Sequence, residues 1–105
     1  MTTQATQDVI AERQRQKDAE GWTPEHDDEH TGGELASAAG CYAMAAAKMV
    51  KNDPGSADYS APTEWPWHPN WWKPSDPRRN LVKAAALILA EIERIDRSAH
   101  PKEGT

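Results

Sequence analysis

A dense run of acids and histidines follows the first tryptophan of the chain. Residues 22–30 read Trp-Thr-Pro-Glu-His-Asp-Asp-Glu-His, and another acid stands four residues further on. Carboxylates accept hydrogen bonds from ribose hydroxyls or from an adenine amino group, and a tryptophan ring offers a face on which a base can stack. This chemistry predicts a ligand-binding cluster made of Trp22, His26, Asp27, Asp28, His30 and Glu34.

The same cluster admits two other interpretations. His26 and His30 are four residues apart, so they share one face of a helical turn. Asp27 or Glu34 would then complete a three-ligand metal site. Alternatively, the acids Asp27, Asp28 and Glu34 only cap the turn and the helix that follows. The sequence leaves these interpretations open.

A second cluster surrounds the start of the last predicted helix, where positive side chains gather beside tryptophans. Cations are unfavourable at a helix N-terminus because the helix dipole is positive there, so a group of them indicates a bound anion. Backbone amides, the dipole and the cations would form a phosphate seat, beside a ring that stacks a base. The residues of this predicted site are Trp67, Trp71, Trp72, Lys73, Arg78 and Arg79.

The competing interpretation of this second cluster is structural. The two arginines would pair with Asp76 and with the acids at 25–29. The tryptophans would fill a core that lacks phenylalanine altogether.

A third group of acids lies near the C-terminal end of the same helix. Glu93 and Asp96 are three residues apart and, with Glu34, would hold a divalent cation. The simpler interpretation is a solvated helix face on which Glu93 pairs with Arg97. The sequence shows no Ser-His-Asp or Cys-His arrangement, phosphate-cradling glycine loop or zinc-ribbon spacing. We therefore predict no catalytic residue, metal or cofactor.

Helical segments would position the first cluster. Residues 7–20 are good helix formers that stop before Gly21, and their sparse apolar content predicts a surface helix with one shallow covered face. Thr23 and Pro24 are suited to be the N-cap and first residue of a helical turn that runs to His30.

Residues 34–51 predict the second helix, because small and apolar residues recur there at helical spacing. Its many alanines would let another helix approach closely. Residues 52–74 hold glycine, several prolines and four tryptophans. The prolines exclude a regular element and the tryptophans argue against disorder, so we expect an ordered loop packed on the helices.

The last helix should open at Pro77 after a cap at Ser75 or Asp76. It carries the most regular apolar pattern of the chain, with a 4-3-4-3 spacing at Leu81, Ala85, Ile88, Ile92 and Ile95. We expect this stripe to lie in the core. A second apolar flank, Leu87 and Leu89, would be covered by the loop tryptophans or by a second protomer.

The length and composition of the chain limit the number of domains, the oligomeric state and the kinds of partner. The 105 residues fit one all-α domain, 1–105, with 1–6 and 100–105 disordered. A hydrophobic fraction of 37%, much of it alanine, leaves a monomer little to bury and favours a homo-oligomer. The net charge of −5 argues against nucleic-acid binding.

Cysteine usage and hydropathy indicate a cytoplasmic protein. Cys41 is the only cysteine, in apolar helical surroundings typical of a buried small hydrophobe. The longest apolar run, 84–90, is far shorter than a membrane span requires, so no membrane association is expected.

Much of the chain resembles a widespread, uncharacterised family of phage and prophage accessory proteins. The resemblance is carried by residues 12–16, 20–30, 33–36, 65–67, 71–74, 78–84 and 88–96. It implies membership and no particular activity.

Three further resemblances suggest ligands. Arg13 with residues 20–23, Asp27, Asp28 and His30 is similar to the ryanodine-receptor repeat domain, a small helical module associated with nucleotides, although its His-Pro and Pro-Tyr continuation is missing. Small phage proteins of this build also resemble sponges of the Sequestin and Lockin type, which sequester nucleotide immune signals. The Glu-x-x-Asp motif of all-α nucleotide pyrophosphohydrolases resembles 93–96, but their Glu-x-x-Glu motif is missing after Glu34.

Together these features predict a phage-type counter-defence protein of the host bacterial cytoplasm. It would bind and sequester a nucleotide-derived immune signal, of the ADP-ribose or cyclic-nucleotide type, without turning it over. One alternative is a Mg²⁺-dependent nucleotide pyrophosphohydrolase that uses Glu34, Glu93 and Asp96. Another is an inhibitor of a host protein that anchors itself through tryptophans.

Overall fold

Helix boundaries follow the capping and breaking residues of the sequence. The computed structural model describes residues 2–51 and 60–99. Its helices are α1 (Gln4–Ala19), α2 (Pro24–Asp27), α3 (Glu34–Lys51) and α4 (Pro77–Ala99), and a 3-10 turn spans Pro69–Trp71 between the last two. The predicted all-α class, with three main helices and a long ordered loop, is confirmed.

The predicted caps explain three of these boundaries. The Thr23 hydroxyl accepts from the His26 amide at 3.3 Å and begins α2. An Asp76 carboxylate oxygen accepts from the Arg79 amide at 2.9 Å and begins α4. Gly21, with φ of 74°, follows α1 in the left-handed conformation that ends many helices.

The start of α1 differs from the prediction. The helix begins at Gln4, and the Thr3 hydroxyl caps it by accepting from the Thr6 amide at 3.2 Å. Residues 4–6, which lie in the segment predicted to be disordered, are therefore helical, because a threonine cap extends the helix. Residue 1 and residues 100–105 lie outside the described residues.

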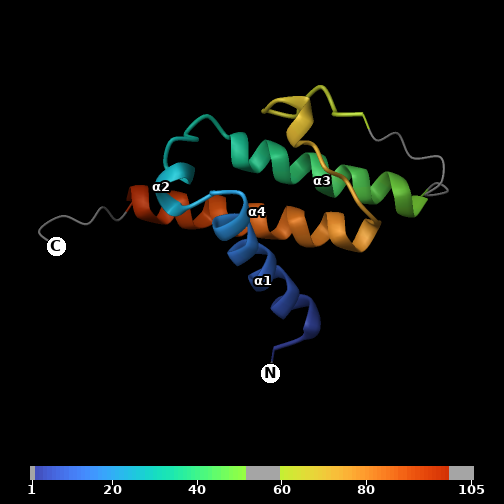
Figure 1. The fold of residues 1–105 in the computed structure, drawn as a ribbon, viewed down its shortest axis with the longest axis horizontal. Helices are drawn as coiled ribbons and strands as arrows, with labels where there is room; N and C mark the ends of the chain where they lie inside the picture. Colours follow the sequence, from blue (N-terminus) through green and yellow to red (C-terminus); the bar gives the residue numbers. More distant parts are fainter. Residues whose placement is uncertain (1, 52–59, 100–105) are drawn as a thin grey trace, which may run out of the picture.

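The core lies between α3 and α4, which run antiparallel along the long axis of the molecule, while α1 crosses α4 at a steep angle (Figure 1). Small residues on both helices allow the close approach that the alanines of α3 predicted. The buried set includes Leu35, Ala38, Ala39, Tyr42, Ala84, Leu87 and Ala90.

The predicted core stripe of α4 is wrong. Leu81, Ile88, Ile92 and Ile95 are each about half exposed, whereas Leu87, placed on a minor flank, is fully buried. The physical reason is the partner helix: α3 approaches closely, so the alanine face of α4 fits against it and the bulky aliphatic face does not.

The loop between α3 and α4 is ordered where it is described, over residues 60–76. Trp65 and Trp72 are each 7% exposed and pack on α3. The predicted loop residues 52–59 lie outside the described residues. Among the helices described, none is long and apolar enough to cross a membrane.

Candidate functional site

Four of the five tryptophans belong to a continuous chain of ring contacts that begins at Tyr42 of α3. Trp72 stacks on Tyr42 with centroids 4.7 Å apart, and Trp65 meets both Trp72 and Trp67 edge to face. Trp67 in turn contacts Trp22 at 5.5 Å. Trp65 and Trp72 are thus core residues, while Trp67 and Trp22 form the partly exposed end of the chain.

Asp27, predicted to read a ligand, is instead a structural residue. It is fully buried, and Arg13 of α1 donates to its Oδ2 at 2.6 Å. A second N–H of Arg13 donates to the Trp22 carbonyl at 3.1 Å. Asp28 is held as well, by Arg97 of α4 at 2.8 Å. These two acids join α2 to the long helices.

His26, His30 and Glu34 form a second group beside α2, in which His30 Nδ1 lies 3.8 Å from a carboxylate oxygen of Glu34. The two imidazole rings are 4.7 Å apart, and His30 also contacts Trp67 at 5.4 Å. Glu34 accepts from the Gly32 amide at 2.7 Å, and backbone hydrogen bonds lower the pKa of its carboxyl. Glu34, the first residue of α3, therefore holds the backbone of the turn that leads into this helix.

The metal alternatives find no support in the arrangement of the acids. Within residues 2–51 and 60–99, no three His, Cys, Asp or Glu side chains are grouped to hold a metal ion. Glu93 lies 3.5 Å from the Arg13 guanidinium, so this acid is engaged with a cation of α1.

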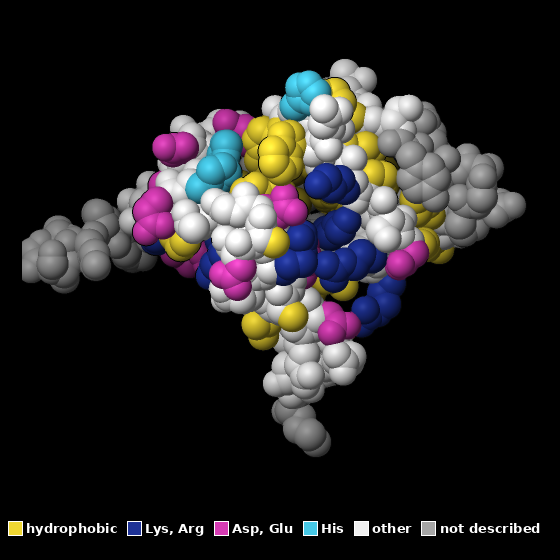
Figure 2. All heavy atoms as spheres, viewed as in Figure 1, with side chains coloured by type: hydrophobic (Ala, Val, Ile, Leu, Met, Phe, Trp, Pro, Cys, Tyr) yellow, Lys and Arg dark blue, Asp and Glu magenta, His cyan; other side chains and the backbone are white. Residues whose placement is uncertain are grey.

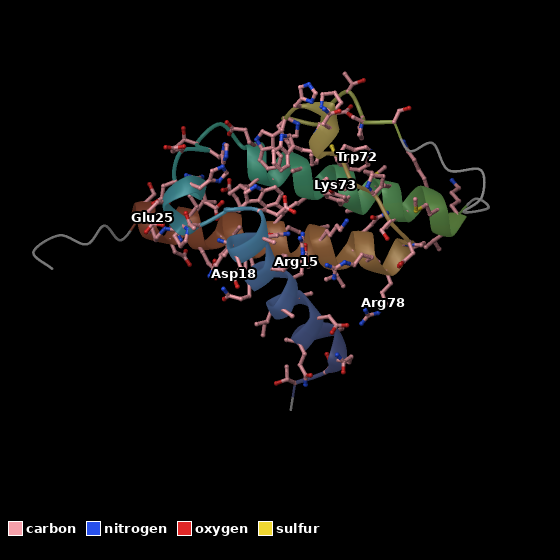
Figure 3. The ribbon with its side chains drawn as sticks, viewed as in Figure 1. Arg15, Asp18, Glu25, Trp72, Lys73 and Arg78 are labelled. Atoms are coloured by element: carbon pink, nitrogen blue, oxygen red, sulfur yellow. The ribbon has the colours of Figure 1, made fainter. Side chains whose placement is uncertain are left out.

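Arg78 and Arg79 contact α1. Arg78 pairs with Asp8 at 2.9 Å, and Arg79 pairs with the buried Glu12. Figure 3 shows Arg78 below the start of α4, on the side of α1. The predicted side-chain pairing with Asp76 and the acids at 25–29 is wrong, because α1 crosses α4 here and supplies closer carboxylates.

A different set of cations converges on a cleft where α1, α3, α4 and the tryptophan loop meet. Lys83 of α4 donates to the Lys73 carbonyl at 2.6 Å, and its ammonium lies 5.4 Å over the Tyr42 ring. The Lys73 ammonium lies 5.6 Å over Trp71, whose ring is 48% exposed. The lining residues are Glu12, Arg15, Gln16, Glu20, Trp22, Tyr42, Trp71, Lys73, Lys83 and Leu87.

The figures show these cations on one face of the molecule. Lys and Arg side chains form a group at the centre of Figure 2, with hydrophobic side chains next to it. Figure 3 labels Arg15 where α1 passes α4, and Lys73 above it, over α3. Trp22, Trp71 and Lys73 are the predicted site residues that meet in this cleft.

Positive charge in the cleft is incompletely balanced. Arg15, Lys73, Lys83 and the neighbouring Arg79 face only the carboxylates Glu12 and Glu20. Burial lowers the pKa of Lys83, and the charges of Arg79 and Arg15 lower it further. An anion in the cleft would relieve this repulsion.

Glu12 is the fixed negative charge beneath these cations. Burial acts to raise the pKa of its carboxyl, but the hydrogen bond from Arg15 and the charges of Arg15 and Arg79 outweigh burial and leave the pKa lowered. Glu12 is therefore ionised and holds both arginines in place. The pKa of Tyr42 is raised by burial, so its hydroxyl keeps its proton.

A larger hollow of about 780 Å³ lies between α3 and residues 60–64. Trp72 is the predicted site residue that lines it, beside Cys41, Met44 and Met49. Burial raises the pKa of Cys41, as expected for the buried thiol that the sequence predicts. Lys48 and Glu64 offset each other on this wall, so the hollow is less suited to a phosphate than the cleft.

Comparison with protein-family models, curated proteins and solved structures finds no significant match. The family resemblances of the sequence thus stay predictions.

The sequence did not single out Arg15, Lys83 or Tyr42. The sequence does contain a pattern that could have identified Lys83 as a site residue. Lys83 stands four residues after Arg79 and therefore lies on the same face of α4. No local pattern predicts that Arg15 and Tyr42 are close in space, because their proximity depends on how α1 packs against the other helices.

Proposed function

We propose that the protein binds a phosphate-bearing nucleotide derivative in this cleft and sequesters it. The observation that carries the proposal is the convergence of Arg15, Lys73 and Lys83, from three separate elements, beside the exposed ring of Trp71. Cations fixed beside an aromatic face suit a ligand that joins a phosphate to a base.

The size of the cleft supports a division of the ligand between two places. A volume of about 30 Å³ has room for roughly two water-sized groups, the scale of phosphoryl oxygens. The phosphate would lie against Lys83 and Arg15, and the base would lie outside on Trp71. The Tyr42 hydroxyl already accepts from the Lys73 amide at 3.2 Å, so its own proton can be donated to a phosphate oxygen.

Binding without turnover is favoured by the positions of the acids. Glu34 accepts from the Gly32 amide and Glu93 lies beside Arg13, so two of the three acids of the pyrophosphohydrolase alternative are already engaged with other groups. Sequestration of an ADP-ribose-type or cyclic-nucleotide immune signal, by a self-associating phage-type protein in the bacterial cytoplasm, needs binding alone.

The experiment is a calorimetric titration with ADP-ribose and with cyclic dinucleotides, followed by heating and mass spectrometry of the released ligand. We expect binding of one ligand class, and recovery of that ligand unchanged in the presence of Mg²⁺. Release of monophosphate products would contradict sequestration, and failure of every phosphate-bearing ligand to bind would contradict the site.

A further inference from the structure

Large aliphatic side chains form an exposed row along α4. Leu81, Ile88, Ile92 and Ile95 expose 48 to 51% of their surface, and Ala85 between them is partly buried. Residues of an α-helix advance by about 100° each, so all five lie within an arc of about 80°. We call these five residues the outer stripe.

Neither neighbouring helix covers the outer stripe. α3 packs on the face of α4 that holds Leu87 and Ala84. α1 contacts the face that holds Arg79 and Glu93, and it reaches the edge of the stripe only at Arg78. The outer stripe keeps the 4-3-4-3 spacing that places residues at the seam of a coiled coil. Lys83, which lines the ligand cleft, stands on the opposite side of α4.

We propose that a second copy of this chain covers the outer stripe, with the two α4 helices antiparallel about a two-fold axis. A two-fold axis requires one surface to fit itself. In an antiparallel seam, Leu81 meets Ile92 of the partner subunit and Ala85 meets Ile88 of the partner subunit. Each alanine then packs opposite an isoleucine, so a small side chain faces a large one and the two helices can approach closely.

Charges at the two ends of the stripe select the antiparallel direction. Arg78 and Asp96 are 18 residues apart, about five turns of helix, so they lie on the same edge of the stripe at opposite ends. The Arg78 side chain stays 60% exposed beside its ion pair with Asp8, so it can also reach a carboxylate of a second chain, and Asp96 has no ion-pair partner among the residues described. In antiparallel packing, Arg78 lies beside Asp96 of the partner subunit, and the two-fold axis repeats this pair at the other end of the seam. In parallel packing, two arginines would lie at one end and two aspartates at the other.

The first test is the solution mass, measured by sedimentation equilibrium at micromolar concentration. We expect twice the 11.6 kDa of a monomer. Ile88→Glu should give a folded monomer, because it places a charge at the centre of the seam. Val50→Glu is the matched control, since Val50 is 73% exposed on α3, and it should stay dimeric. Circular dichroism confirms that each variant is folded.

The second test addresses direction. Asp96→Arg should raise the dimer dissociation constant by about tenfold or more, as expected for reversing paired charges, and adding Arg78→Asp should restore it. A monomeric wild type, or a dimer indifferent to Ile88→Glu, would overturn the interface. Failure of the charge exchange to restore association would overturn the antiparallel arrangement. Because the stripe and the cleft lie on opposite sides of α4, these results are independent of ligand binding.

Discussion

Arg13 of α1 donates to the buried carboxylate of Asp27 at 2.6 Å and thereby fixes α2 against the rest of the molecule. The same guanidinium donates to the Trp22 carbonyl, so one side chain sets both the start of the α2 segment and the position of the ring that lines the cleft. The pair is inside the protein, where its geometry is protected from water.

The first prediction concerns this pair. Asp27→Ala should lower the free energy of unfolding by about 3 to 5 kcal/mol, because it leaves the buried Arg13 charge without its close partner and with only the 3.5 Å contact to the exposed Glu93. Asp28→Ala is the control: its pair with Arg97 is exposed, so we expect a loss of about 1 kcal/mol or less. Urea denaturation measures both, and equal losses would contradict a structural role particular to Asp27.

The second prediction compares two glycines. Gly21 has φ of 74°, and although a Cβ there would meet no atom within 4 Å, Gly21→Ala should destabilise by about 1 kcal/mol through backbone strain. Gly40 lies inside α3 with equally open space, so Gly40→Ala should stabilise by about 0.5 to 1 kcal/mol. The check is thermal denaturation of both variants; a gain at position 21 would show that the left-handed turn is dispensable.

Local signals predicted the elements well. The threonine and aspartate caps, Pro24, Pro77 and the glycines fixed where α2, α3 and α4 begin, because caps act within one turn of chain. The same sequence misled on the packing of α4. Periodicity shows that a helix has an apolar face, but the partner helix determines which face is buried. In α4 the alanine face is buried against α3, and the isoleucine face is exposed.

The candidate site was only partly predictable for the same reason. Trp22, Trp71 and Lys73 were found because aromatic and basic residues cluster in sequence. Arg15 and Lys83 are 68 residues apart in the chain, and no local pattern indicates that α1 brings them together. Likewise, the acids predicted to read a ligand looked free because their partners Arg13 and Arg97 are remote in sequence.

The third prediction separates the two adjacent tryptophans. Trp72→Ala should cost about 3 to 5 kcal/mol of stability, because it removes a buried ring stacked on Tyr42. Trp71→Ala should leave stability nearly unchanged, since that ring is 48% exposed, and should weaken nucleotide binding by about 1 to 3 kcal/mol. Unfolding curves and calorimetry test the pair. Undiminished binding by Trp71→Ala would remove the ring from the site.

The fourth prediction is a dependence on pH. Burial, Arg79 and Arg15 place the pKa of Lys83 below 10.5, so its ammonium is lost in the folded protein before it is lost in the unfolded chain. As pH rises between these two values, the ligand-free protein should gain stability from Lys83, whereas nucleotide affinity should fall. Tyr42, Lys73, Glu12 and Glu20 also face the cleft, so Lys83→Arg is the reference, because arginine stays charged. Identical pH profiles would contradict the role of Lys83.

The most direct test of the account is the affinity of one matched pair of variants for the nucleotide that binds wild type, measured by calorimetry near neutral pH. Lys83→Gln removes a cation from the cleft, and Lys48→Gln removes one from the wall of the larger hollow on α3. We predict that Lys83→Gln weakens binding by about 10- to 100-fold, the effect of losing one charge-assisted hydrogen bond, and that Lys48→Gln binds like wild type. Wild-type affinity in Lys83→Gln, or a loss confined to Lys48→Gln, would contradict the cleft as the ligand site.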